Sequence, residues 1–137
     1  FIRGLSDGDA GPPRRVGVVD ERGEIAALCQ GEPQFYVGRH TDVMDGCSKA
    51  EGLSMLIRGM NPQVAAVDEI TAPADAAAIM SAAGCGVALV ATAHGAGAGD
   101  LERRASYREL LAARIFRRLV VLERRNGERT IRVEEMP

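Results

Sequence analysis

The stretch Val64-Ala65-Ala66-Val67-Asp68-Glu69-Ile70 decides the fold that we expect, because four small apolar residues run directly into two acids. A short, continuous apolar run is typical of a strand that is buried on both faces of a parallel sheet. Open α/β sheets bind their ligands at the carboxyl ends of such strands. An aspartate there can hold Mg²⁺, and a following glutamate can orient or deprotonate an attacking water. This pattern, called Walker B, is weak by itself, because an ordinary buried strand with a solvated acidic end has the same sequence.

Two further apolar segments also end in polar side chains. Residues 16–19 lead into Asp20-Glu21-Arg22, and residues 86–91 lead into Thr92-Ala93-His94. The carboxyl ends of parallel strands meet at one edge of a sheet. We therefore expect a crevice with up to four carboxylates, an arginine, a hydroxyl and an imidazole. Such a group suits Mg²⁺-assisted phosphoryl transfer, in which the protein mainly positions charge and water.

Helices are expected between these strands. Residues 49–60 carry apolar side chains at the spacing of one helix face. Ser48 and Glu51 form the pattern of a capping box at the start of this helix. The other expected helices are residues 71–83, with proline in the first turn, and residues 100–113, with a break near Ala105.

The remaining segments complete an α/β pattern. Residues 1–6 resemble the last turn of a helix, and the Gly-rich residues 23–41 predict an irregular excursion over the strand ends. Residues 119–122 and 130–133 flank an Asn-Gly turn, which predicts a β-hairpin. The alternation of strands and helices predicts a parallel, doubly wound sheet, with the hairpin closing one edge.

Composition narrows the class of protein. A chain of 137 residues with 46% hydrophobic and 26% charged residues suits a single globular domain. The net charge of −2 argues against nucleic acid as a partner. The three cysteines show no Cys-x-x-Cys spacing and are expected to be reduced thiols. Without an apolar run long enough to cross a bilayer, we expect a cytoplasmic protein, or one peripheral at a membrane.

Five separated segments together resemble a known family. They include Val-Gly-Val-Val-Asp-Glu-Arg near the start, Arg-His-Thr-Asp in the middle, and the later Val-Asp-Glu-Ile and Ala-Thr-Ala-His-Gly. The full segments are residues 16–26, 39–52, 56–62, 67–70 and 91–95. In this order and spacing they resemble the stage III sporulation protein AA family, over roughly residues 14–134. That family comprises ATPases of endospore-forming bacteria that are similar to the type II and type IV secretion ATPases.

The resemblance implies a RecA-like, P-loop NTPase sheet and a role for each of eight residues. Glu69 is expected to be the catalytic base, with Glu21 and His94 assisting, and Asp68 to hold the Mg²⁺ that accompanies ATP. The residues expected to contact the nucleotide are Asp20 of the acidic box, Thr92 of the histidine box, Arg39 and Arg58. The implied partners are ATP, a membrane-associated sporulation complex and other copies of the chain in a hexamer.

One motif of the family is absent. No Gly-x-x-x-x-Gly-Lys-Ser/Thr occurs in residues 1–137, and the resemblance places this phosphate loop upstream of Phe1. We therefore expect residues 1–137 to be a partial ATPase domain that is inactive by itself, because the backbone N–H groups and the lysine of the phosphate loop, which bind the triphosphate, are absent. Two alternatives stay open. One is a non-catalytic module that docks onto other subunits, and the other is a metal hydrolase that uses Asp20, Asp68 and His94.

Overall fold

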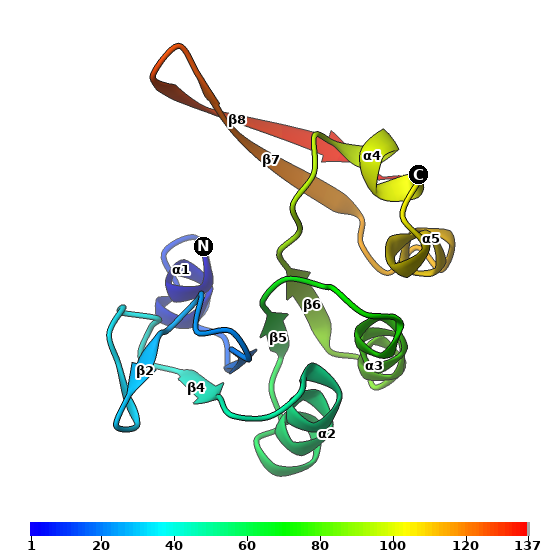
Figure 1. Ribbon diagram of the computed structural model, residues 1–137. Helices are drawn as coiled ribbons and strands as arrows, with labels where there is room; N and C mark the ends of the chain where they lie inside the picture. The colour runs from blue at the N-terminus through cyan, green and yellow to red at the C-terminus, as the bar shows by residue number, and fades with distance from the viewer. Residues whose placement is uncertain (137) are drawn as a thin grey trace.

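A computed structural model describes residues 1–136 and contains a four-stranded parallel sheet at its centre (Figure 1). The strand order is β4-β1-β5-β6. The strands are β1 (Val16–Val19), β4 (Thr41–Met44), β5 (Val64–Val67) and β6 (Ala88–Ala91). The predicted α/β class with a parallel sheet is confirmed. β1 and β5, the two central strands, are buried along their whole length, as their continuous apolar sequences require.

Strand β4 was not predicted from the sequence. It pairs with β1 at the edge of the sheet and begins where the predicted irregular segment, residues 23–41, ends. Its sequence Thr-Asp-Val-Met begins with two polar residues and is only partly buried, so it lacks the continuous apolar run that identified β1 and β5. The excursion before it contains one short antiparallel pair, β2 (Leu28–Cys29) with β3 (Glu32–Pro33).

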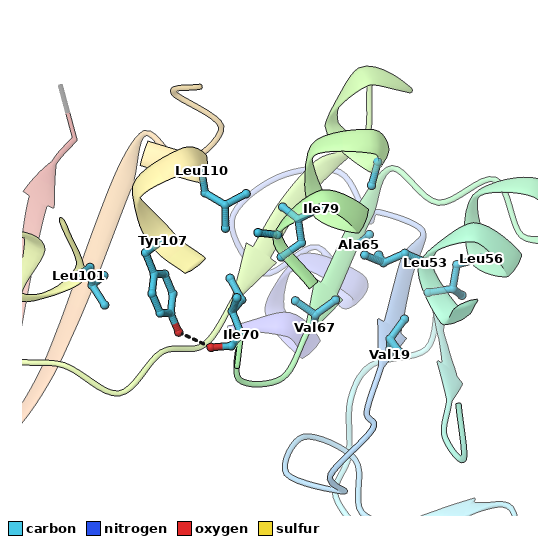
Figure 2. Packing of buried hydrophobic residues seen from close by; sticks show 12 residues of the cluster. Val19, Leu53, Leu56, Ala65, Val67, Ile70, Ile79, Leu101, Tyr107 and Leu110 are labelled. Atoms are coloured by element: carbon cyan, nitrogen blue, oxygen red, sulfur yellow. Dashed lines mark hydrogen bonds between the residues drawn. The ribbon is translucent and has the colours of Figure 1, made fainter. Parts of the chain in front are cut away.

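Helices cover both faces of the sheet. The helices are α1 (Ile2–Asp7), α2 (Lys49–Gly59), α3 (Pro73–Gly84), α4 (Ala98–Glu102) and α5 (Ala105–Ala112). Ile2 and Leu5 of α1 pack against Val16 and Val18, whereas α2 and α3 cover the opposite face and α5 packs against α3. There Leu53, Leu56 and Ile79 form one buried cluster with Val19, Ala65 and Val67, and Leu110 of α5 adds to it beside Ile79 (Figure 2). The predicted capping box is confirmed, with Ser48 accepting from the Glu51 backbone and Glu51 from the Ser48 backbone.

The C-terminal hairpin forms as predicted, but it does not pair with the parallel sheet. Strands β7 (Arg118–Arg125) and β8 (Glu128–Glu135) join through Asn126 and Gly127, which both have positive φ, as the tight turn requires. The prediction that this hairpin closes an edge of the sheet is wrong, because it forms a separate two-stranded sheet (Figure 1). Leu119 packs against the core cluster that contains the helices, and β7 does not pair with β6.

No helix within residues 1–136 combines the length and the apolar character that crossing a membrane requires.

Tyr107 of α5 ties the helical layer to the end of β5. Its buried hydroxyl donates a hydrogen bond to the carbonyl oxygen of Ile70 at 2.7 Å (Figure 2). Burial raises the pKa of this phenol, and the Glu69 carboxylate adds to the increase. The contact holds α5 against the residue that follows Asp68 and Glu69.

We expect Tyr107→Phe to lower the free energy of unfolding by about 1–2 kcal/mol, because the Ile70 carbonyl loses its buried donor while the aromatic ring keeps its packing. Urea unfolding of the 137-residue chain measures this. The matched control is Tyr36→Phe, which removes a hydroxyl that bonds Asp7 from an exposed ring. Equal losses in the two variants would show that the Tyr107 hydroxyl contributes nothing particular to the fold.

Candidate functional site

The register of the sheet places the carboxyl ends of β1, β5 and β6 next to one another. Val19 lies opposite Val67, and Val67 lies opposite Ala91 in the parallel pairing. The residues that follow the strands, Asp20, Asp68 and Thr92, therefore start the loops of one common edge. The expected meeting of the acidic and Thr-x-His segments at the carboxyl ends of the strands is observed.

In each Asp-Glu pair the aspartate is buried and the glutamate is partly exposed. Asp20 and Asp68 are 1% and 0% exposed, whereas the side chains of Glu21 and Glu69 are 39% and 16% exposed. Successive residues of an extended chain point to opposite sides, which accounts for the division. The aspartates are therefore internal groups, and the glutamates are the carboxylates that a ligand in solvent can reach.

Asp20 organises the loop that follows β1. Its carboxylate accepts four backbone N–H groups at 2.8–3.0 Å. The donors are the N–H groups of Glu24, Ile25, Ala26 and Ala27. The resemblance implied that Asp20 contacts the nucleotide, but here both of its oxygens are engaged by the chain's own backbone. Its visible role is to shape residues 20–27.

Asp68 faces a buried lysine. Its Oδ1 lies 3.1 Å from Nζ of Lys49, and its Oδ2 accepts the backbone N–H of Arg22 at 2.6 Å. The Lys49 contact is an ion pair whose angles fall short of a hydrogen bond, so Oδ1 has no hydrogen-bond donor within residues 1–136. Close opposite charges at this distance attract strongly in a buried setting regardless of the angle.

Lys49 is the single lysine of the chain and is only 1% exposed. Its ammonium group also lies 2.7 Å from Oε2 of Glu21 and 3.9 Å from Oδ2 of Asp75. Burial by itself lowers the pKa of Lys49, but the hydrogen bond to Glu21 and the negative charges of Asp68 and Asp75 outweigh it and raise the pKa. Lys49 is therefore a buried cation at the centre of three carboxylates.

Glu69 lies between an arginine and a histidine. Its Oε2 accepts a hydrogen bond from Nη1 of Arg22 at 2.6 Å and lies 3.9 Å from Nε2 of His94. Arg22 also contacts Glu24 at 3.2 Å, so its guanidinium bridges two carboxylates. The His94 side chain is 83% exposed, and Thr92 is exposed at the carboxyl end of β6.

Two predicted site residues lie at the opposite end of the sheet. Arg39 precedes β4, where its backbone N–H donates to Asp7 of α1 at 2.8 Å. Arg58 is about two and a half turns along α2 from Lys49, in the last turn and exposed. The structure thus brings neither arginine to the acidic cluster of its own chain. Their predicted contact with the nucleotide stays a prediction.

The residues do not fit a metal ion bound directly by Asp68. No group of three or more His, Cys, Asp or Glu side chains within residues 1–136 is arranged to hold one. The place beside Oδ1 of Asp68, where a cation would be attracted, is taken by the ammonium group of Lys49. The carboxylate's other oxygen is engaged by the Arg22 backbone.

Our interpretation of the sequence missed the roles of Lys49, Arg22 and Asp75. Asp75 accepts the backbone N–H groups of Thr71 and Ala72 at the start of α3, while its Oδ2 faces Lys49. One feature of the sequence could have indicated that Lys49 is paired with carboxylates. A lysine in the first turn of a helix has the wrong sign for the helix dipole, which favours acids there, so it calls for nearby carboxylates.

The comparisons with known proteins agree with the resemblance seen in the motifs. The family model described as "Sporulation stage III, protein AA" matches residues 1–134. A curated protein of Bacillus subtilis (strain 168), named "Stage III sporulation protein AA", is 44% identical over 119 residues. The alignment covers 87% of this chain and 39% of that protein. The chain therefore spans less than half the length of the curated relative that it matches.

Proposed function

Because the chain belongs to the stage III sporulation protein AA family, we propose that it is part of a RecA-like, P-loop ATPase that acts in sporulation. In this proposal the whole protein hydrolyses ATP and uses the energy for assembly or transport by a membrane complex during endospore formation. Support comes from the family match, from the parallel sheet, and from the polar groups at its carboxyl edge. That edge is where open α/β sheets bind ligands.

The observation that carries the proposal is the setting of Glu69. It is a partly exposed carboxylate at the end of a buried parallel strand, with Arg22 at 2.6 Å and His94 at 3.9 Å. Arg22 binds Oε2, whereas Oε1 has no hydrogen-bond partner within residues 1–136. Oε1 is thus the oxygen that can accept a hydrogen bond from a water molecule. A fixed carboxylate with one open oxygen suits a general base.

The reaction then follows in one displacement. Glu69 accepts a proton from water, and the water oxygen forms a bond to the γ-phosphorus of ATP. The bond from that phosphorus to the β,γ-bridging oxygen breaks, and ADP leaves with this oxygen. The proton on Glu69 returns to solvent or to phosphate. The exposed His94 and Thr92 can donate hydrogen bonds to the γ-phosphate oxygens, and Glu21 assists from the neighbouring strand end.

In this proposal Mg²⁺ is part of the substrate. The ion enters with ATP as its counter-ion, since the acidic cluster has no arrangement for a resident metal. Arg39 and Arg58 are proposed to contact the nucleotide from a neighbouring copy, because both are exposed and lie far from Glu69 of their own chain. This requires a ring of several copies, which we propose to be a hexamer as in the secretion ATPases.

We expect Glu69→Gln to reduce ATP turnover by the full-length gene product about 10²–10⁴-fold, because glutamine keeps the shape of the side chain but cannot take the proton. A phosphate-release assay in Mg²⁺ measures turnover. The matched control is Glu24→Gln, which neutralises the other carboxylate on Arg22 and should leave turnover within about twofold. Unchanged turnover in folded Glu69→Gln would remove Glu69 from the reaction.

One observation favours a second candidate, a module that docks onto other subunits without hydrolysing ATP. The hairpin carries four large apolar side chains on one face, with exposed fractions of 51–74%. They are Val120, Leu122, Ile131 and Val133. Exposed apolar surface of this kind is typical of a binding interface. If the unmodified full-length gene product assembles but shows no turnover, this candidate replaces the ATPase.

A further inference from the structure

Three carboxylates from three separate segments converge on the ammonium group of Lys49. Glu21 follows β1, Asp68 follows β5 and Asp75 lies in the first turn of α3. Lys49 itself is the first residue of α2, where the helix dipole disfavours a positive charge. A long charged side chain is rarely buried unless it is paired. The position of Lys49 is therefore determined by the acidic cluster and not by its own helix.

We propose that Lys49 is a positioning residue whose buried ammonium group is the internal cation of this site, and that Asp68 is its counter-ion rather than a metal ligand. The ammonium group lies 3.1 Å from Oδ1 of Asp68 and 2.7 Å from Oε2 of Glu21. A divalent ion bound by the same oxygens would have to occupy the space of the ammonium group. The two cations therefore exclude one another.

The arrangement also orients the surface carboxylate. Lys49 fixes Asp68, and Oδ2 of Asp68 accepts the backbone N–H of Arg22 at 2.6 Å. The guanidinium of Arg22 in turn donates to Glu69 at 2.6 Å. Lys49 thus acts on Glu69 through Asp68 and Arg22. This chain of contacts links α2, the end of β5 and the loop after β1.

The test is Mn²⁺ titration of the 137-residue chain without nucleotide, followed by the electron paramagnetic resonance of free Mn²⁺. We expect the unmodified chain to bind no Mn²⁺ at this cluster. Lys49→Met keeps an unbranched apolar stem and removes the charge. It should gain one Mn²⁺ site at least about tenfold tighter than any site of the unmodified chain, because oxygen ligands without a cation attract a divalent ion. A purely structural role of Lys49 would not create this site.

Thermal unfolding supplies a second readout, which works even if Lys49→Met is poorly folded. Removing one partner of a buried ion pair is strongly destabilising, so the melting temperature of Lys49→Met should fall by roughly 10 °C or more. The double variant Lys49→Met/Asp68→Asn should melt higher than Lys49→Met, since it removes the carboxylate left without a partner. It should also lose the acquired Mn²⁺ site. Lys49→Arg, which keeps the charge, should bind no Mn²⁺.

Two results would overturn the proposal. The first is Mn²⁺ binding by the unmodified chain that Asp68→Asn abolishes, which would make Asp68 a metal ligand beside Lys49. The second is a double variant whose loss of melting temperature equals the sum of the losses of the two single variants, which would show that Lys49 and Asp68 are not coupled. None of these measurements uses ATP turnover, so failure of the ATPase proposal would leave the pairing of Lys49 with Asp68 standing.

Discussion

Replacing Asp20 with alanine is expected to destabilise the 137-residue chain by about 3–5 kcal/mol. The four backbone N–H groups that its carboxylate accepts would lose their acceptor together. A buried donor left without a partner costs about 1–3 kcal/mol, and the total stays below four times this value because Ala26 is fully buried whereas Glu24, Ile25 and Ala27 are at least partly exposed to water. The loop from residue 20 to residue 27 would lose its present shape.

Urea unfolding of the nucleotide-free chain measures the effect, with a lower midpoint at unchanged slope as the expected result. Asp42→Ala is the matched control, since Asp42 is an exposed aspartate on edge strand β4, and it should stay within about 0.5 kcal/mol of the unmodified chain. Asp20→Asn should also destabilise, because its amide group presents a donor to backbone donors. If Asp20→Ala and Asp42→Ala unfold at the same urea concentration, Asp20 has no structural role. Its implied contact with nucleotide would then be its main role.

Gly52→Ala in α2 is expected to lower the free energy of unfolding by about 1–3 kcal/mol, although alanine is the better helix former. A Cβ atom at residue 52 would lie 2.5 Å from Cγ1 of Val19 and 3.1 Å from Sγ of Cys47. Val19 is fully buried in β1 and cannot move aside. The added methyl group would therefore push α2 away from β1 and carry Lys49 away from its carboxylates.

Gly59→Ala provides the control within the same helix. Nothing lies within 4 Å of a Cβ atom at residue 59, so this variant should be neutral or more stable by up to about 1 kcal/mol. The measurement is again urea unfolding, with the two variants compared at equal slope. Equal stability of Gly52→Ala and Gly59→Ala would mean that α2 does not depend on its close approach to β1.

Much of the fold could be predicted because its signals are local. The apolar runs that became β1 and β5, the capping box at Ser48 and the Asn-Gly turn of the hairpin each depend on neighbouring residues. Strand β4 could not be found in this way, because an edge strand is only half covered and its sequence needs no continuous apolar run. The place of the hairpin depends on the packing of Leu119 against the core cluster, which gathers residues from several helices and strands.

The candidate site likewise has features that the sequence predicts and features that only the packed fold determines. By itself, the sequence determined which polar residues stand at the carboxyl ends of the parallel strands, and its motifs determined the family. Only the tertiary structure decided that Asp20 and Asp68 are internal while Glu69 reaches solvent, and that Lys49 is the cation among them. The physical reason is that strand and helix signals arise between residues close in the chain. Burial and charge pairing arise between residues such as Lys49, Glu21 and Asp75, which only the packed fold brings within ion-pair distance.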